Sequence, residues 1–527
     1  MLTCKKIICA CLSLLLILPF SACGSGKADQ LIKYNIPSDP VNLDPPLADD
    51  PQSALVVTNL FEGLLRLTAD GKLTEGVASD YEMSGDGLSY TFHLRKEAKW
   101  SDGTALTAKD FVFGFQRLFD PSTGSVSAKR LYCIENAEQV HAGTLPVDSL
   151  GVTAADDQTL TIHLAYPDAM FLTLLTTPAA MPCNETFFKE AKGRYGLTGK
   201  TILSNGAYYL KDWSKGEYLA LRRNEEYHSA ASVKNGGVSL YIQQDTAATF
   251  ADFNSGGIHA LYLDGRQAEA LTGKGYHIDK DSNTVWGVLI NRTKPALSNG
   301  NIVKALAYGL DRSSYTEYLS DYLSTAEAIV PPAVTILDRS YREDLSEAAG
   351  PSYNAEAARQ AAQTGFSELQ VANLTELTVI VPKDPPIPSL FSYVSQVWQR
   401  DLGIYFKVEQ LELDEYRRRL SAGDFDCAVI QLAGEYNSPG VFLSQFEGME
   451  QYGIQLPGLR ELLHQASRGN LEQSAALYQQ AEQMVLDSGI FLPLFYQTNC
   501  FISSSSVTGF IHDISGQIVD FKNCTFS

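Results

Sequence analysis

The chain lacks the short motifs by which most enzyme classes are known. Its 527 residues contain no H-E-x-x-H pair for zinc, no C-x-x-C, no G-x-S-x-G turn and no G-x-G-x-x-G loop. Residues 193–201 approach a phosphate-binding loop, but their first glycine comes one residue too early and no apolar strand leads into them. We therefore expect a surface loop there, no catalysis and no cofactor.

Histidine is scarce, and its positions do not indicate a metal site. The eight histidines show no helical or turn spacing that would bring two of them onto one ion. Carboxylates are plentiful, but the separation of a catalytic pair cannot be derived from abundance. We expect no bound metal, and an enzyme would have no positive feature in this sequence.

Positive charge is in deficit. The 41 lysines and arginines stand against 61 aspartates and glutamates, which makes a formal net charge of -20. Nucleic acids and anionic lipids are bound through basic patches, so neither is expected as the main partner. Hydrophobic residues make up 45% of the chain, as in a well-packed globular protein, and the length predicts two or three lobes rather than one core.

Long hydrophobic runs are absent after position 26. The apolar run before it, residues 7–20, follows two lysines and ends in small residues, which is the pattern of a secretory leader. A cysteine directly after Ser21-Ala22 resembles a bacterial lipobox. We therefore predict a lipoprotein signal peptide over 1–22, lipid attachment at Cys23 and a polar tether over 23–30. Ordinary secretion with an incidental cysteine is the alternative.

Five further cysteines lie beyond the tether, an odd number without metal-type spacing. Cysteine is among the most buried residue types, so we expect mostly free, buried thiols. A disulfide near the C-terminus between the last two is the alternative. The five are Cys133, Cys183, Cys427, Cys500 and Cys524.

Residues 90–120 form the organising local pattern of the chain. The first apolar residues alternate with polar ones, which predicts a short strand with one buried face. A Ser-Asp-Gly turn follows at 101–103. Thr107 with Asp110 three residues later marks a helix start, and the apolar residues after it fall on one helical face until Asp120-Pro121 ends the helix.

Strand and helix patterns alternate between residues 377 and 432, which is the clearest topology signal. Strands are predicted at 377–381, 404–408 and 425–432, and helices at 389–402 and 414–420. Such alternation implies a parallel sheet with helical crossovers, whose ligands gather in loops beyond the carboxyl ends of the strands. The loop at 433–440 is therefore a candidate binding loop, although its composition would equally suit an ordinary turn.

Weaker patterns complete the prediction. Residues 55–65 read as a helix with Gly63 near its end, 150–164 as a small sheet, and 205–221 as a hairpin around residues 214–216. A capped, alanine-rich helix is expected from 354 to 362.

Several segments, in order and over most of the chain beyond Leu31, resemble peptide-type solute-binding proteins of ABC importers, the bacterial extracellular solute-binding protein family 5. The segments are Asn42-Leu43-Asp44-Pro45, 60–65, 90–120, 205–213, 291–312, Gly423-Asp424-Phe425-Asp426 and 435–439. The resemblance implies an α/β fold of the periplasmic-binding-protein-like type II clamshell kind, with two lobes joined by a hinge and an extra domain.

The resemblance also implies discontinuous lobes. Lobe I is expected over 31–61, 190–285 and 497–527, the extra domain (II) over 62–189, and lobe III over 286–496. In this fold, closure about the hinge buries the ligand between the lobes.

By the same resemblance, Glu435-Tyr436-Asn437 stands where the family holds the α-ammonium of a peptide with an acidic residue. Glu435 takes the place of the usual aspartate, and Tyr436 and Asn437 are expected to bind ligand beside it. Trp286 is expected to form a wall of the site, with core packing as the alternative. Val429 occupies a position where some relatives carry a carboxylate-binding arginine, so no fixed grip on the C-terminus of a short peptide is expected there.

The function implied is that of an extracytoplasmic receptor, lipid-anchored to the bacterial cell membrane, that captures oligopeptides and delivers them to ABC importer permease subunits. We expect a monomer that contacts the membrane through its lipid anchor only, at the cell surface or in the periplasm. The alternatives are a receptor of the same fold for another solute, such as a metal chelate or an oligosaccharide, and a secreted peptide hydrolase. The acidic-Tyr-Asn segment favours an amine-bearing ligand.

Overall fold

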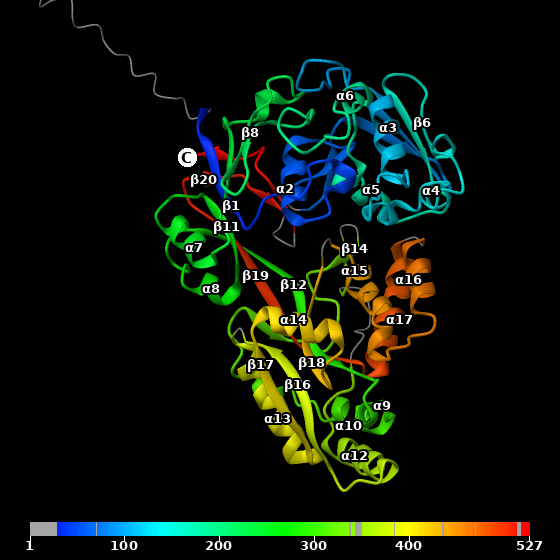
Figure 1. Ribbon diagram of the computed structural model, residues 1–527, viewed down its shortest axis with the longest axis vertical. Helices are drawn as coiled ribbons and strands as arrows, with labels where there is room; N and C mark the ends of the chain where they lie inside the picture. Colours follow the sequence, from blue (N-terminus) through cyan, green and yellow to red (C-terminus); the bar gives the residue numbers. More distant parts are fainter. Residues whose placement is uncertain are drawn as a thin grey trace, which may run out of the picture.

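The computed structural model describes residues 29–69, 71–336, 339–342, 350–383, 385–434, 437–468, 471–513 and 518–527 (Figure 1). Figure 1 shows an upper body and a lower body, with two long strands running from one to the other. The upper body is built from residues 29–275 with the C-terminal residues from 504, and the lower body from residues 291–490.

One mixed sheet of eleven strands passes through both bodies. Its order is β17-β16-β18-β12-β19-β11-β1-β10-β9-β8, with β13 beside β19. The strands are β1 (Leu31–Ile36), β8 (Tyr208–Ser214), β9 (Tyr218–Arg223), β10 (Gly237–Ile242), β11 (Ala260–Asp264), β12 (His277–Ile290), β13 (Leu323–Thr325), β16 (Leu374–Pro382), β17 (Ile404–Leu411), β18 (Cys427–Ala433) and β19 (Phe491–Ser503).

The long strands β12 and β19 join the two bodies. They pair with each other in antiparallel orientation, while β19 also pairs with β11 above and β12 with β18 below. The register of the pair shifts between Asp281 and Thr284. This bulge separates the half of the strand pair beside β11 from the half beside β18, and a bulge is a place where a strand bends.

The alternating segment of the lower body forms the predicted parallel strands. β16 pairs in parallel with β17 on one side and β18 on the other. The helices α13 (Ile387–Leu402) and α14 (Leu413–Ala422) make the crossovers between them. α13 ends at Gly403, whose φ of 68° is the left-handed conformation that glycine adopts without strain. The topology predicted for this segment is confirmed.

Residues 90–120 fold as predicted. β5 (Ser89–Leu94) buries alternate residues and belongs to a four-stranded sheet with β4 (Ala78–Met83), β6 (Val152–Ala154) and β7 (Thr159–His163). α3 (Ala108–Phe119) begins at a capping box, in which the Asp110 carboxylate accepts from the Thr107 N–H at 2.7 Å. Phe111, Phe115, Leu118 and Phe119, the apolar residues of its inner face, are buried in the upper body.

The helix predicted at 55–65 exists, but it begins and ends earlier than predicted, so the prediction is wrong in its bounds. α2 runs from Pro51 to Leu60, because Asp50 caps it by accepting from the Ser53 N–H and proline suits the first turn. The chain after Leu60 is extended. A Cβ at Gly63 would come within 2.8 Å of the Leu175 carbonyl oxygen, so this glycine allows close passage of two backbones rather than ending a helix.

The other sequence-based elements agree with the structure. β8 and β9 form the expected hairpin, and α12 (Ala355–Leu369) is capped by Asn354. Residues 193–201 form turns at the surface of the upper body, where the Leu43 N–H donates to the Gly196 carbonyl at 3.1 Å. No helix begins in this loop, and β8 is the next element after it.

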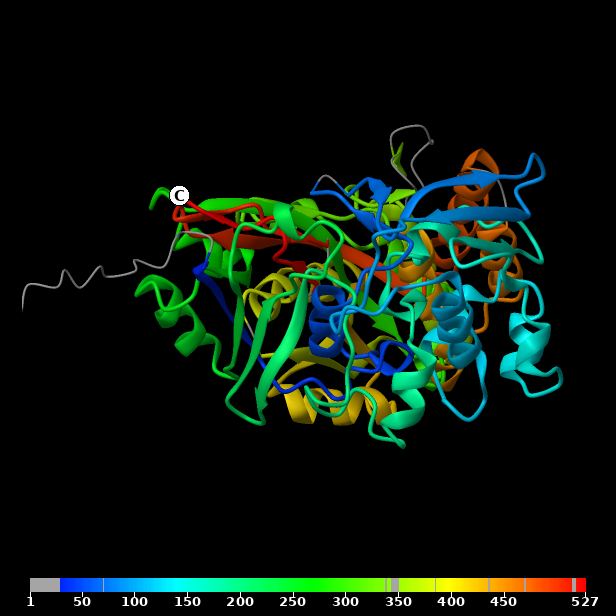
Figure 2. The same ribbon diagram turned by 90° about the horizontal axis from the view of Figure 1, so that it is seen from above.

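Further helices and strands cover the two bodies, and both views place α16 and α17 on the side of the molecule away from the C-terminus (Figures 1 and 2). The remaining helices are α4 (Ala137–His141), α5 (Phe171–Leu174), α6 (Glu185–Glu190), α7 (Thr246–Asn254), α8 (Gly265–Glu269), α9 (Pro295–Ser298), α10 (Gly300–Tyr308), α11 (Ser313–Thr316), α15 (Pro439–Leu443), α16 (Leu459–Ser467) and α17 (Leu471–Ser488). The remaining strands are β2 (Leu65–Leu67), β3 (Leu73–Glu75), β14 (Thr335–Ile336), β15 (Arg339–Ser340), β20 (Val507–Thr508), β21 (Ile511–His512), β22 (Val519–Asp520) and β23 (Thr525–Phe526).

Each body has its own hydrophobic core. The largest cluster fills the upper body, and two others lie on the two faces of the sheet in the lower body. The five cysteines beyond the tether are buried free thiols, and Cys500 and Cys524 are not joined. A search of the described residues finds no helix with the length and apolarity needed to cross a membrane.

Candidate binding site

A cavity of about 620 Å³ lies between the two bodies. The upper body contributes α2, the extended chain after it and residues near α5, while the lower body contributes Ala333, Thr335 and Asn437. Asp281, at the bulge of β12, and His512, in the C-terminal segment, line the cavity as well. Both bodies and the strand that joins them therefore share one cavity.

The wall of this cavity is strongly charged. Carboxylates outnumber basic side chains, so the wall as a whole favours a ligand that carries positive charge. The carboxylates are Asp49, Asp50, Glu62, Asp281, Asp513 and Asp520, and the basic residues are Arg66, Arg130, His512 and Lys522.

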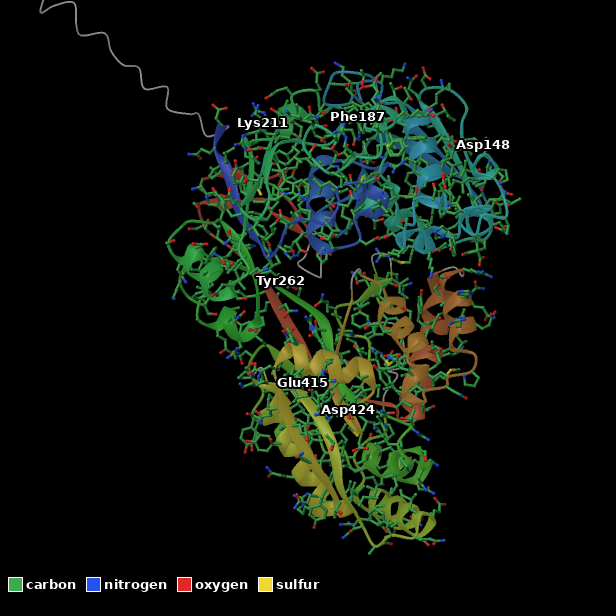
Figure 3. The ribbon with its side chains drawn as sticks, viewed as in Figure 1. Asp148, Phe187, Lys211, Tyr262, Glu415 and Asp424 are labelled. Atoms are coloured by element: carbon green, nitrogen blue, oxygen red, sulfur yellow. The ribbon has the colours of Figure 1, made fainter. Side chains whose placement is uncertain are left out.

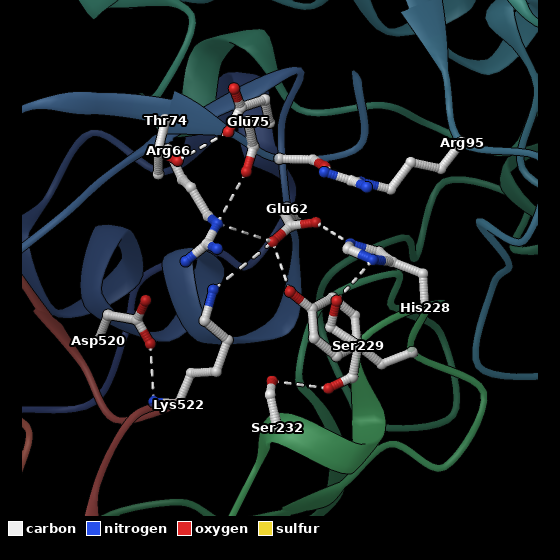
Figure 4. A network of polar contacts seen from close by, with 12 residues as sticks. Glu62, Arg66, Thr74, Glu75, Arg95, His228, Ser229, Ser232, Asp520 and Lys522 are labelled. Carbon is white, nitrogen blue, oxygen red and sulfur yellow. Dashed lines mark hydrogen bonds and ion pairs between the residues drawn. The ribbon is translucent and has the colours of Figure 1, made fainter. Parts of the chain in front are cut away.

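Glu62 is the centre of the polar network drawn in Figure 4 and is only 6% exposed. Tyr227 donates its hydroxyl to Oε1 at 2.5 Å, and His228 Nε2 lies 2.5 Å from Oε2. Two cations stand farther off, with Lys522 Nζ 3.6 Å and Arg66 Nε 3.7 Å from Oε1. A buried carboxylate needs such compensation to remain ionised.

The surroundings of Glu62 set its charge. Burial alone would raise the pKa of its carboxyl, but the hydrogen bond with His228 and the charge of Lys522 outweigh burial and hold the pKa below its ordinary value. Burial and the charge of Glu62 raise the pKa of Tyr227, which stays a hydroxyl donor. The backbone at Glu62 is fixed by Asn205, whose side chain accepts its N–H at 3.2 Å and donates to its carbonyl at 2.8 Å.

A second charged cluster lies at the bulge of β12. His512 Nδ1 is 3.3 Å from Asp281 Oδ2, and its Nε2 is 3.5 Å from Asp279 Oδ2. The imidazole stacks on Phe501 with 4.5 Å between ring centroids. Tyr262 of β11, near the place where the bodies meet in Figure 3, has its pKa raised by burial and by the charge of Asp281. The cluster ties the C-terminal segment to the strand that enters the lower body.

The two aspartates of this cluster differ in character. A hydrogen bond with His512 lowers the pKa of Asp279. Burial raises the pKa of Asp281 to about 6, and although His512 opposes the shift, Asp513 and Asp279 add to it. Burial lowers the pKa of His512, but its hydrogen bond with Asp279 and the charge of Asp281 outweigh burial and raise it. Ionised Asp281 is therefore the destabilised member of the cluster.

This difference predicts a stability effect of opposite sign for the two residues. A carboxyl whose pKa is higher in the folded chain favours folding while protonated, so its contribution is lost as pH rises from about 4 through about 6. We expect Asp281→Asn to raise the free energy of unfolding by about 1 kcal/mol at pH 8, after allowance for partial exposure, and by progressively less toward pH 4.

Urea unfolding at pH 8, 6 and 4.5 measures this effect. Asp279→Asn is the matched control, because its lowered pKa means that the ionised form stabilises the fold above the unfolded pKa, so the substitution should destabilise the protein at pH 8. A loss of stability in Asp281→Asn at pH 8 would show that His512 pairs with Asp281 more strongly than burial opposes its charge.

The lower body presents a reciprocal pair of hydrogen bonds to the cavity. The Thr335 N–H donates to Asn437 Oδ1, and Asn437 Nδ2 donates to Thr335 Oγ1, both at 2.8 Å. Glu482 of α17 holds the chain that leads to Thr335, since it accepts the N–H groups of Ile329 and Val330 at 2.8 Å each. These contacts tie β14 to the segment between β18 and α15.

The structure describes only some of the ligand-binding residues that were predicted from the sequence. Asn437 lines the cavity, as a ligand-binding residue would. Glu435 and Tyr436 lie outside the described residues, and so does Cys23. Their predicted roles stay predictions.

Trp286 lies on β12, within the lower half of the joining strand. Its ring stacks on Phe495 with 6.3 Å between centroids, and its Nε1 donates to Gln497 Oε1 at 2.7 Å. It is not one of the described residues that line the cavity. Its role as a wall of the site stays a prediction, with core packing as the alternative.

Most of the charged wall was not anticipated from the sequence. Lys522, Asp281, His512 and Thr335 stand in segments without a recognisable motif. The one available signal was Glu62, a carboxylate inside the otherwise apolar segment 60–65. Among the residues that the structure describes, no group of three or more His, Cys, Asp or Glu is placed to hold a metal ion.

Comparison with known proteins adds independent information. The sequence model described as bacterial extracellular solute-binding proteins, family 5 middle, matches residues 72–453. The chain is 28% identical to the oligopeptide-binding protein OppA of Bacillus subtilis, with 98% of each chain covered. It is 25% identical to the dipeptide-binding protein DppE of the same organism, with 93% of this chain and 91% of that one covered.

A solved structure agrees with these matches. The substrate-binding domain of an oligopeptide ABC transporter from Bacillus anthracis superposes with a TM-score of 0.73 at 25% identity, and covers 95% of this chain and 99% of that one. The predicted fold class, an α/β clamshell of the periplasmic-binding-protein-like type II kind, is confirmed.

Proposed function

Because the chain belongs to the bacterial extracellular solute-binding proteins of family 5, we propose that it captures oligopeptides outside the cytoplasm and delivers them to the permease of an ABC importer. The cavity of about 620 Å³ carries this proposal, since both bodies contribute residues to its wall. Ligand pockets have volumes of roughly 300–1,000 Å³. The protein would act by binding and release, without a chemical step.

The chain would divide as the sequence suggested, into lobe I (31–61, 190–285 and 497–527), an extra domain II (62–189) and lobe III (286–496). The bulge of β12 between Asp281 and Thr284 supports a hinge at the boundary near residue 285. A bend at this place would move the lower body toward the upper body and close the cavity on its ligand.

Peptide recognition would use the loop after β18. Glu435 would hold the α-ammonium of the peptide, with Tyr436 and Trp286 as walls and Asn437 beside them. The position of this loop at the carboxyl end of parallel strands supports the assignment, as does the place of Asn437 in the cavity wall. The main chain of an extended peptide would pair with the protein by strand addition.

The N-terminal sequence supports a proposal for where the receptor acts. The lysine pair, the apolar run and Ser21-Ala22-Cys23 support a leader that is removed and a lipid on Cys23. The receptor would be a monomer held at the outer side of the bacterial cell membrane by that lipid, over a tether from 23 to 30. Peptide and permease are its expected partners, and nucleic acid is not.

Ligand-dependent stabilisation tests the function. A ligand that binds only the folded state stabilises it by about 2.7 kcal/mol when present at a hundred times its Kd, so members of a panel of di- to octapeptides should raise Tm by several degrees. Glu435→Gln should weaken peptide binding at least tenfold in calorimetry and leave folding intact. Glu415→Gln is the matched control, on an exposed helix away from the cavity (Figure 3).

The outcomes separate the candidate functions. Peptides recovered intact by mass spectrometry after incubation support binding, whereas cleaved peptides would indicate a hydrolase. If no peptide raises Tm while a metal chelate or an oligosaccharide does, the receptor serves that solute instead. Equal affinities of Glu435→Gln and the parent protein would remove Glu435 as the ammonium partner.

A further inference from the structure

We propose that the Lys522 ammonium and the Arg66 guanidinium form a subsite for a carboxylate carried by the ligand. The inference rests on the proposed function in taking the ligand to be a peptide. Both residues line the cavity wall, and Figure 4 shows their charged groups side by side next to Glu62. They come from opposite ends of the chain, β2 and the C-terminal segment, and meet only in the fold.

The two cations share a single carboxylate whose oxygens are already engaged. Lys522 Nζ and Arg66 Nε both approach Glu62 Oε1, at 3.6 and 3.7 Å, which is beyond hydrogen-bond distance. That oxygen accepts from Tyr227 at 2.5 Å, and the other lies 2.5 Å from His228 Nε2. Glu62 therefore supplies one negative charge for two positive ones, and its short hydrogen bonds go to neighbours other than the cations.

Lys522 is buried with its donors unused. Its side chain is 7% exposed, and Nζ makes no hydrogen bond with any residue that the structure describes. Nζ also lies 5.9 Å from the centroid of the Tyr227 ring. The Asp520 carboxylate accepts the backbone N–H of Lys522 at 2.8 Å and does not pair with the ammonium. An ammonium has three donors, and because Lys522 lines the cavity, a ligand there can accept from them.

Arg66 offers the complementary half of the subsite. Its Nε donates to the Glu75 carbonyl at 2.9 Å, which fixes the plane of the guanidinium. The two terminal nitrogens make no hydrogen bond within the described part of the chain, and 35% of the side chain is exposed. A carboxylate that reaches this place would accept from both cations, and such charge-assisted hydrogen bonds are among the strongest that proteins make.

The location of the subsite gives the ligand a direction. Lys522 and Arg66 belong to the upper body, whereas the loop with Asn437 belongs to the lower body. A peptide that places its ammonium at the lower wall and a carboxylate at the upper wall would link the two bodies across the cavity. The carboxylate has two sources, the C-terminus of the peptide or an aspartate or glutamate side chain.

Calorimetry with matched peptides tests the subsite on the full chain. The strongest binder of the panel is compared with its C-terminal amide and with versions in which each acidic side chain is replaced by its amide. We expect one of these neutral versions to bind about tenfold more weakly or worse, since hydrogen bonds to charged groups are worth that much. The version that loses affinity identifies the source of the carboxylate.

Substitutions then locate the loss. In Lys522→Met and in Arg66→Gln, the charged and neutral peptides should bind nearly alike, and Lys522→Arg should restore the difference. Arg66→Gln serves as the second variant because its side chain is partly exposed and its loss is tolerable for folding. Lys109→Met is the matched control, an exposed lysine paired with Asp157 and remote from the cavity.

Each outcome decides whether Lys522 and Arg66 form a carboxylate subsite. If the parent protein binds peptides but all versions bind equally, Lys522 and Arg66 only neutralise Glu62 and the subsite is refuted. It is also refuted if the charged peptide keeps its advantage in both variants, because the carboxylate is then held elsewhere. If no peptide binds the parent protein, the proposed function itself fails, and the subsite fails with it.

Discussion

Replacing Arg117 with methionine is expected to lower the free energy of unfolding by about 3–5 kcal/mol. Arg117 lies on α3 and forms a bidentate pair with Asp44, with Nη1 to Oδ1 at 2.8 Å and Nη2 to Oδ2 at 2.6 Å. Both side chains are buried, and the guanidinium stacks on the Phe188 ring at 3.8 Å. Without the cation, the Asp44 carboxylate stays buried with no countercharge.

A second substitution, in Asp44, distinguishes loss of the countercharge from simple loss of packing. In the pair Asp44→Leu and Arg117→Met no charge is buried, so most of the stability should return. Lys189→Met is the control, because Lys189 and Glu185 form an exposed pair, and such pairs contribute about 0.3–0.5 kcal/mol. Urea unfolding measures the three variants, and hydrogen exchange of α3 locates the change. If the double variant is no more stable than Arg117→Met, the Arg117 contacts with Phe188 and Cys183 carry the effect.

The Arg117–Asp44 pair also shows what local sequence patterns cannot predict. The segment with Asp44 and the segment 90–120 were both recognised, and the strand, turn and capped helix of the second form where predicted. Local spacing is enough for that, because alternation and caps act within a few residues. The ion pair between the segments depends on how α3 packs against the chain before α2, and that is a tertiary choice which local patterns do not contain.

The parallel strands of the lower body were predictable for a related reason. Short strands and helices in alternation leave few topologies, and a parallel sheet with crossovers is the favoured one. The loop after the last strand followed from the same rule. The contact between Asn437 and Thr335 could not be predicted in this way, because Thr335 belongs to another segment and reaches Asn437 only through the fold of the lower body.

The bounds of α2 were predicted wrongly, and the composition of the cavity wall was not predicted. The physical reasons for these two failures differ. The apolar run after Leu60 fits a helix as well as a buried extended chain, and tertiary contact at Gly63 decides for the second. The charged wall brings together Glu62, Lys522 and Asp281 from three distant parts of the chain. Charge alone predicts that such residues lie at the solvated surface, and only the fold shows that they line one cavity.

Glu482→Leu is expected to have the other large effect, on both stability and binding. The Glu482 side chain is fully buried and, besides the N–H groups of Ile329 and Val330, accepts from the Tyr341 hydroxyl at 3.0 Å and Arg342 Nη2 at 2.6 Å. Leucine leaves the mostly buried Arg342 guanidinium without its countercharge and the two backbone donors without their acceptor, a loss of about 3–5 kcal/mol.

The same residue holds part of the cavity wall in place. The chain it fixes at Ile329 and Val330 continues directly to Ala333 and Thr335, which face the cavity, and Thr335 holds Asn437. A loosened segment must be ordered again when ligand binds, and that ordering reduces affinity. We therefore expect Glu482→Leu to weaken peptide binding about tenfold at temperatures where the protein is still folded.

Glu482→Gln separates position from charge. Glutamine keeps an acceptor oxygen for the two N–H groups of Ile329 and Val330, so its affinity for peptide should stay close to that of the parent protein, with a smaller loss of stability. Glu461→Leu, at an exposed position on neighbouring α16, controls for the added side chain. Calorimetry gives the affinities, and hydrogen exchange of residues 329–336 reports the loosening. Normal affinity in Glu482→Leu together with fast exchange in this segment would mean that peptide does not contact the wall that carries Thr335.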